Sequence, residues 1–181
     1  MDRKLTVAEL GRTDVEGYRK KEKWPVRFIL DDVRSRHNVG SIFRTADAFG
    51  LEGIELCGFT PCPPHREIEK TALGATLSVP WRHHASGPAA VECLKAEGYT
   101  IWCVEQTRSA VRLNDWRPDP GERIALVLGN ELNGVSDATI ALGHGALVIP
   151  QHGTKHSLNV SVCAGVVLWQ AALAMGNSYQ P

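Results

Sequence analysis

The sequence predicts an α/β fold, in which a mostly parallel β-sheet carries helices on both of its faces. Short and almost purely apolar runs recur along the chain, and segments with helix-capping residues lie between them. The apolar runs contain few charges, as is typical of strands that are covered on both sides. With 181 residues, 43% of them apolar, the chain is long enough for one domain with a substantial core.

Six apolar runs form the predicted strands, and turn or capping residues bound each of them. These strands cover residues 26–30, 53–57, 76–81, 99–104, 124–128 and 146–149. Helices are predicted from Asn38 to Gly50, over residues 66–73, from Ser86 to Gly98 and from about Ser136. Residues 108–123 are charged and irregular, with Trp116 as the expected anchor of that loop.

The N-terminal segment is expected to form a helical extension over residues 1–25, separate from the domain at residues 26–181. Thr6 and Glu9 have the spacing of a capping box, which predicts a helix over residues 6–21. The first 27 residues contain eight basic and five acidic side chains. The basic end of this helix is either a solvated face or a surface that binds phosphates.

The C-terminal stretch is unusually poor in charge. Between Ala138 and Pro181 there is no Asp or Glu, and Lys155 is the only Lys or Arg. A helix is predicted over residues 157–175, with Ser157 as its N-cap and apolar side chains around most of its circumference. One face of it can pack on the sheet and another on a second subunit. Its apolar run is shorter than the ~20 residues of a membrane span, so no membrane role is expected.

Composition narrows the function classes further. Lys plus Arg equals Asp plus Glu at 20 each, which gives no bulk electrostatic argument for nucleic acid. The charged N-terminus lacks an apolar signal segment, so a cytoplasmic protein is expected. The five cysteines form no C-x-x-C pair and are expected to be buried thiols. His152 and His156 flank a glycine in a loop, and no metal site is expected.

Three loops form the expected binding site. They follow the strands that end at Val104, Leu128 and Ile149, and ligands of parallel sheets bind at the carboxyl ends of the strands. Residues 129–136 have the outline of a phosphate loop, but Val135 occupies the position that requires lysine. No G-x-G-x-x-G follows a strand either. The pattern therefore indicates a nucleoside-like pocket and argues against ATP, GTP or a dinucleotide.

Arg44 lies in the second turn of a helix that follows the first strand. This position suits contact with a phosphate or a substrate hydroxyl, and it equally suits a surface salt bridge.

Three ordered motifs resemble those of the SpoU-type RNA ribose methyltransferases of the SPOUT superfamily. They are N-V-G-S-I-F-R-T-A-D-A-F-G (residues 38–50), L-V-L-G-N-E-L-N-G-V-S (126–136) and I-P-Q-H-G-T-K-H-S-L-N-V-S (149–161). The resemblance covers residues 26–174. It implies an S-adenosylmethionine-dependent 2′-O-methyltransferase with a C-terminal deep trefoil knot. It also implies a homodimer whose active site forms at the subunit interface.

The resemblance assigns roles to particular residues. The implied catalytic residues are Arg44, Glu131, Ser157 and Asn159. The implied cofactor-binding residues are Val104, Glu105, Gln106, Gly129, Ile149 and Leu158. The implied RNA-binding residues are Arg34, Arg36, Asn38 and Lys155.

The implied substrate is tRNA in preference to ribosomal RNA, and the alternative is a catalytically silent knotted module that only binds RNA. Because a guanidinium stays protonated in proteins, an arginine at the catalytic position either acts as an unusual base or stabilises negative charge on the 2′ oxygen.

Overall fold

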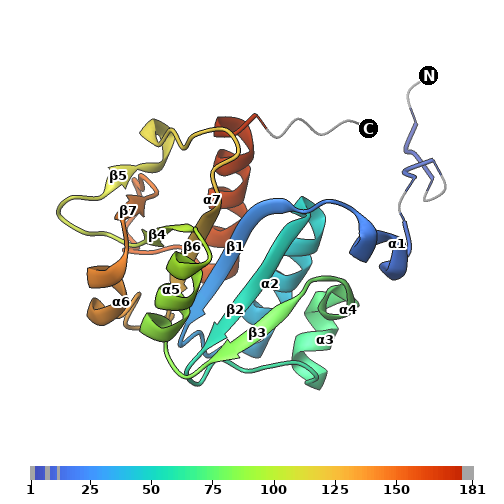
Figure 1. The fold of residues 1–181 in the computed structure, drawn as a ribbon, viewed down its shortest axis with the longest axis horizontal. Helices are drawn as coiled ribbons and strands as arrows, with labels where there is room; N and C mark the ends of the chain where they lie inside the picture. Colours follow the sequence, from blue (N-terminus) through green and yellow to red (C-terminus); the bar gives the residue numbers. More distant parts are fainter. Residues whose placement is uncertain (1–2, 7–8, 12, 177–181) are drawn as a thin grey trace.

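A computed structural model of the chain describes residues 3–6, 9–11 and 13–176, and its seven strands form one sheet (Figure 1). The strands are β1 Trp24–Asp31, β2 Leu51–Cys57, β3 Trp81–His84, β4 Thr100–Val104, β5 Val111–Arg112, β6 Ile124–Gly129 and β7 Gly145–Val148. Their order is β3-β2-β1-β6-β4-β7-β5, and every neighbouring pair is parallel. The predicted parallel sheet is confirmed.

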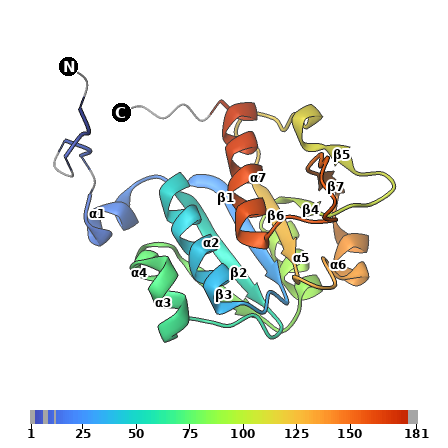
Figure 2. The same cartoon turned by 180° about the vertical axis from the view of Figure 1, so that it is seen from behind.

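Helices cover both faces of this sheet. They are α1 Val15–Lys20, α2 Arg36–Phe49, α3 Arg66–Ala72, α4 Ala75–Ser78, α5 Gly87–Ala96, α6 Asp137–Leu142 and α7 Val160–Ala174. Figure 1 shows α5 and α6 in front of the sheet, and Figure 2 shows α2 and α7 on the opposite face. Along β1, Phe28 and Leu30 belong to the core under α2 and α7, whereas Ile29 belongs to the core under α5. Alternate side chains of one strand therefore fill two separate cores.

Helix α2 begins earlier than predicted. Its N-cap is Ser35, whose hydroxyl accepts a hydrogen bond from the Asn38 backbone N–H at 3.3 Å, so the prediction of Asn38 as the cap is wrong. Gly50 ends the helix at a φ of 69°, as predicted. Gly40 allows α3 to approach, because a Cβ there would lie 2.2 Å from the Ile68 carbonyl oxygen.

Three other predictions are corrected by the structure. Residues 76–81 do not form a strand, since Gly74 at a φ of 89° opens the short α4 and β3 begins only at Trp81. The loop 108–123 contains β5 and a 3₁₀ turn at Leu113–Asp115. Helix α7 is capped by Asn159 and not by Ser157. The prediction of Trp116 as an anchor is confirmed, since this residue is buried against Trp102 with ring centroids 5.8 Å apart.

The N-terminal segment differs from one continuous helix. Thr6 and Glu9 form the capping-box hydrogen bonds, with the Thr6 N–H donating to Glu9 Oε2 at 2.7 Å. However, α1 begins at Val15 with Asp14 as its N-cap, and residues 7, 8 and 12 of the predicted helix lie outside the described residues. The Tyr18 hydroxyl donates to the Asp47 carbonyl oxygen of α2 at 3.1 Å. This contact attaches α1 to the α2 face.

None of the helices in the described ranges has the length and apolarity to cross a membrane. The same residues contain no cluster of three or more His, Cys, Asp or Glu side chains placed to share a metal ion. Cys57 and Cys103 are buried, and Cys62, Cys93 and Cys163 are half-buried.

Candidate functional site

A cavity of about 300 Å³ lies at the carboxyl ends of β4, β6 and β7, beside the first turn of α7. Its walls come from three connections, at residues 104–106, 128–134 and 147–160. These are the three loops that the sequence predicted. The volume is at the lower end of the range for small-molecule sites.

The lining of this pocket combines apolar and acidic character. Its apolar members include Val104, Leu128, Leu147, Leu158 and Val160, and its polar members include Glu105, Gln106, Asn130, Glu131, Ser157 and Asn159. Two of these side chains are carboxylates, and none of the described residues that line the pocket is Lys or Arg. Such a lining favours a neutral or cationic ligand with an apolar ring over a phosphate ester.

A hydrogen-bonded chain joins the pocket to the start of α2. The Glu131 carboxylate accepts from the backbone N–H groups of Arg34 at 2.9 Å and Ser35 at 3.0 Å. It also accepts from Asn38 Nδ2 at 2.9 Å. Asn38 Oδ1 in turn accepts from Asn159 Nδ2 at 3.1 Å. Each of the three motifs therefore contributes one side chain to the same network.

Glu131 is suited to positioning rather than to proton transfer. Burial raises the pKa of its carboxyl group, but hydrogen bonds from Arg34, Asn38 and Ser35 outweigh burial and hold the pKa below its usual range. A carboxylate that is stabilised in its ionised form is a poor general base. Its contacts instead fix the first turn of α2 relative to the pocket.

Asn159 links the same network to α7. Its Oδ1 caps the helix by accepting from the Ser161 backbone N–H at 2.9 Å, while its Nδ2 contacts Asn38. One turn further on, Cys163 lines the pocket. Burial, with a smaller contribution from Glu105, raises the pKa of its thiol to about 11, so the thiol is neutral at physiological pH.

Asn130 is a pocket residue that the sequence analysis did not identify. Its Oδ1 accepts from the backbone N–H groups of Leu132 at 2.9 Å and Asn133 at 3.1 Å, and its Nδ2 donates to the Asp32 carbonyl oxygen at 2.8 Å. Gly134 completes this turn, with reciprocal backbone hydrogen bonds to Asn130 of 2.9 Å each. The available signal was the Asn-x-x-x-Gly spacing of an Asx turn directly after a buried strand.

A family model described as the SpoU rRNA Methylase family matches residues 25–169 of the chain. The chain belongs to the SpoU methylase family. The matched region begins with β1 and includes most of α7, so it contains all three connections that form the pocket.

Individual SpoU relatives agree with this assignment. The chain is 32% identical to the tRNA (guanosine(18)-2′-O)-methyltransferase of Thermus thermophilus, over 90% of this chain and 82% of that protein. The crystal structure of the A. aeolicus TrmH/SpoU tRNA modifying enzyme has a TM-score of 0.77 and 26% identity, covering 90% of this chain and 83% of that one. The AdoMet-bound rRNA methyltransferase of Sinorhizobium meliloti has a TM-score of 0.76 and 27% identity, covering 86% and 59%.

Most residues that the SpoU resemblance singled out meet at the pocket. All six predicted cofactor-binding residues line it, namely Val104, Glu105, Gln106, Gly129, Ile149 and Leu158. Three of the four predicted catalytic residues also line it, namely Glu131, Ser157 and Asn159. The Ser157 side chain is exposed and has no hydrogen-bond partner among the described residues, so its hydroxyl is available to a ligand.

The fourth predicted catalytic residue, Arg44, lies elsewhere. It is exposed on α2, does not line the pocket of its own chain, and forms no ion pair or hydrogen bond with the other described residues. An arginine without an internal partner has its full set of donors available for an external anion. Within the part of the chain that the structure describes, Arg44 therefore does not form the surface salt bridge that was its alternative role.

The predicted RNA-binding residues fall into two groups. Arg34 and Lys155 have exposed side chains, and Arg36 is exposed with an ion pair to Glu67 at 3.4 Å. Asn38 differs, because its amide is occupied by the network with Glu131 and Asn159. The structure thus gives Asn38 an internal contact where the sequence suggested an RNA contact.

Proposed function

We propose that the chain is an S-adenosylmethionine-dependent methyltransferase that methylates a ribose 2′-OH of RNA, with tRNA as its substrate in preference to ribosomal RNA. One observation carries the proposal: the SpoU motifs at residues 126–136 and 149–161, together with the loop after β4, enclose a pocket that contains two carboxylates and, among its described lining residues, no basic side chain. The similarity to the Thermus thermophilus tRNA methyltransferase supports the choice of tRNA.

The residues of the pocket fit S-adenosylmethionine. Val104, Ile149 and Leu158 provide apolar contact for a base, and Glu105 and Glu131 favour a cationic ligand. When bound, this cofactor supplies an electrophilic methyl group on a sulfonium centre. The contribution of the chain is to bind this ligand and to hold the ribose hydroxyl beside it, which is where most of the rate enhancement originates.

Arg44 has the chemistry to act on the RNA side of the reaction. Its guanidinium can hold a phosphate in a fixed geometry and stabilise the negative charge that develops on the 2′ oxygen as the hydroxyl loses its proton. We propose that Ser157, whose hydroxyl lies at the pocket and has no partner among the described residues, contacts the ribose. Glu131 and Asn159 maintain the positions of α2 and α7 around these groups.

We propose a homodimer formed through α7. Val162, Val166, Trp169 and Leu173 form a continuous apolar stripe on this helix and are 38% to 60% exposed. Such a stripe on a helix without charged residues marks a face that a protein partner covers. We further propose that a second copy on this face brings its Arg44 to the pocket of its neighbour, since Arg44 does not line the pocket of its own chain.

Replacing Trp169 with glutamate should convert the dimer into monomers and abolish methyl transfer, because an uncompensated carboxylate would be buried in the interface. Sedimentation equilibrium measures the change in mass. Leu77→Glu is a matched control, since Leu77 on α4 is 60% exposed like Trp169 and lies away from α7. An unchanged mass for Trp169→Glu would remove α7 from the interface.

We also propose that the chain forms the deep trefoil knot of the family. In support, the chain crosses from β6 past β4 to insert β7 next to β5, and then returns to α7 on the α2 face. Joining the two termini covalently tests this proposal. In denaturant, a knotted ring stays more compact than an unknotted ring of the same length. If the closed chain and an unknotted ring of the same length had equal hydrodynamic radii, the knot would be ruled out.

Residues 1–25 are proposed to form an extension that contacts RNA or the second subunit, attached to a domain at residues 26–181. The exposed Lys20 and Lys21 support an RNA contact. Replacing both with alanine should then reduce the salt dependence of RNA binding, whereas a role in the dimer would lower the mass of the assembly instead. We further propose that the enzyme acts in the cytoplasm, which cell fractionation can test.

The central experiment is transfer of labelled methyl from S-adenosylmethionine to unmodified tRNA and, separately, to unmodified ribosomal RNA, followed by nucleoside mass spectrometry. We expect a 2′-O-methylnucleoside in the tRNA. The same product only in ribosomal RNA would change the substrate, and cofactor binding without transfer to either RNA would indicate a catalytically silent RNA-binding module.

A further inference from the structure

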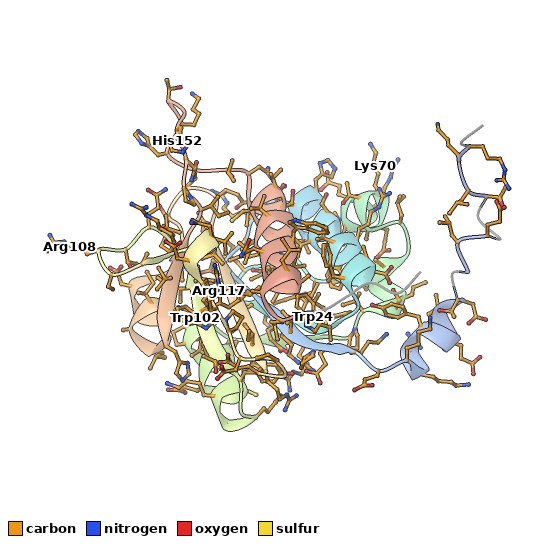
Figure 3. The ribbon with its side chains drawn as sticks, turned by 90° about the horizontal axis from the view of Figure 1, so that it is seen from above. Trp24, Lys70, Trp102, Arg108, Arg117 and His152 are labelled. Atoms are coloured by element: carbon orange, nitrogen blue, oxygen red, sulfur yellow. The ribbon has the colours of Figure 1, made fainter. Side chains whose placement is uncertain are left out.

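The connection between β7 and α7, residues 150–158, forms one wall of the pocket. Gln151, Ser157 and Leu158 of this connection line the cavity, and residues 150–158 are exposed along their whole length. Figure 3 shows His152 at the tip of the connection, projecting away from α7 and the body of the molecule. This wall is therefore the part of the pocket with the least packing against the rest of the fold.

A single side chain supplies the hydrogen bond that holds this connection. Gln106 Nε2 donates to the His156 carbonyl oxygen, and no other hydrogen bond between described residues reaches positions 150–158. The neighbouring turn at residues 130–134 is different, because the Asn130 side chain and two reciprocal backbone hydrogen bonds stabilise it. The attachment of the 150–158 wall thus depends on one amide.

Gln106 is itself held in place by Glu105. The Gln106 N–H donates to Glu105 Oε1 at 2.7 Å, and Glu105 Oε2 accepts from the Val135 N–H at 3.0 Å. The Glu105 N–H donates to the Leu147 carbonyl oxygen at 3.0 Å. Two adjacent residues after β4 therefore connect all three loops of the pocket, and the Gln106 side chain is the link to the least supported one.

We propose that Gln106 is a positioning residue that holds the 150–158 connection closed over the pocket and thereby sets the rate at which the cofactor leaves. The identity of the cofactor rests on the proposed function, whereas the closure of the connection does not. Gln106 acts through the position of Ser157 and Leu158, and its own side-chain donor is used by the His156 carbonyl.

The sequence offers a direct probe of this closure without any cofactor. Lys155 is the only Lys or Arg between Ala138 and Pro181, and it is exposed in the connection, so trypsin can cut this region at one bond only. In Gln106→Ala, cleavage after Lys155 should be about five- to tenfold faster, the factor that corresponds to one lost hydrogen bond. Gln106→Glu should behave in the same way at neutral pH, because a carboxylate cannot donate to a carbonyl.

Gln170→Ala on α7 is the matched control, since this half-buried glutamine forms no hydrogen bond with the described residues and does not line the pocket. Its cleavage rate should equal that of the unsubstituted chain. All variants should melt at the same temperature, which separates local opening from loss of the fold. Equal cleavage rates for Gln106→Ala and the unsubstituted chain would overturn the proposal.

Cofactor binding supplies the second measurement. Dissociation of S-adenosylmethionine, followed by stopped flow, should be about five- to tenfold faster in Gln106→Ala than in the unsubstituted chain or in Gln170→Ala. If the unsubstituted chain does not bind S-adenosylmethionine but the trypsin difference persists, the proposed function fails and the closure stands. If the cofactor binds and dissociates equally from both chains, the role of Gln106 in retention is wrong.

Discussion

Replacing Arg44 with alanine should lower methyl transfer by about 10²- to 10³-fold, the loss typical of removing one donor that stabilises a developing negative charge. The affinity for S-adenosylmethionine should remain unchanged, since the contacts proposed for Arg44 are with the phosphate and the 2′ oxygen of the RNA and not with the cofactor. The fold should also be unaffected, because the side chain is exposed and makes no internal ion pair. Single-turnover methylation and calorimetric cofactor binding measure the two quantities separately.

Arg66→Ala provides the control for Arg44→Ala. Arg66 is also exposed, lies at the start of α3, and has no ion pair with a described residue. Its replacement should reduce RNA affinity slightly and leave the single-turnover rate at saturating RNA unchanged. Arg44→Lys should recover only part of the activity, because an ammonium group lacks the planar pair of donors. Normal transfer by Arg44→Ala would exclude this residue from the mechanism.

Replacing Glu55 with alanine should lower the free energy of unfolding by about 3–5 kcal/mol, as expected when one member of a buried ion pair is removed. Glu55 on β2 is fully buried and accepts hydrogen bonds from Arg27 Nη1 at 2.6 Å and Arg82 Nε at 2.9 Å. His84 Nε2 lies 2.7 Å from the same carboxylate. Its loss would leave the two guanidinium groups without their shared partner.

The same group predicts a loss of stability in acid. Burial raises the pKa of Glu55, but the hydrogen bonds from Arg82, His84 and Arg27 outweigh burial and hold the pKa below its usual range. A lowered pKa in the folded state contributes stability above the ordinary glutamate pKa of about 4.3, and this contribution disappears as the pH falls through the folded value. Urea titrations at pH 7 and at successively lower pH should show this loss.

Glu67→Ala is the control for Glu55→Ala. The Glu67 side chain is 50% exposed, and its ion pair with Arg36 spans 3.4 Å in solvent. Its removal should change the free energy of unfolding by no more than about 1 kcal/mol. The loss of stability at acid pH should be the same as in the unsubstituted chain. If the two substitutions had the same effect, the buried cluster around Glu55 would not be a source of stability.

The parallel sheet was predictable because its central strands are almost entirely apolar, with Arg27 as the one charged residue in the runs 26–30 and 124–128. Residues 26–30 and 124–128 have almost no alternative to a doubly covered strand, and the structure pairs them directly. Residues 76–81 (T-L-S-V-P-W) were also predicted as a strand, but they form the end of α4 and a bend before β3 begins at Trp81. The Gly74 backbone and a hydrogen bond from Ser78 to Asp47 on α2 decide this outcome, and the second is a tertiary contact with no local signal.

The three loops of the site followed from the topology, and the roles of their residues came from the resemblance to the SpoU family. The side-chain contacts between the loops could not be predicted from either the topology or the resemblance. Asn38 and Asn159 are 121 positions apart, and nothing near either residue indicates that their amides meet. The same holds for Gln106 and His156, whose contact requires that β7 lies next to β4.

The separation of Asn38 and Asn159 also bears on when the site appears during biosynthesis. Ribosomes deliver α2 and the first three strands well before Asn159 and α7, which follow them by more than 70 residues (roughly, from β3 to α7) along the chain. Until then the Asn38 amide lacks its partner and the cavity lacks its last wall. A nascent chain that has not yet reached Asn159 therefore lacks a complete pocket for the cofactor, and activity can begin only after α7 has been synthesised.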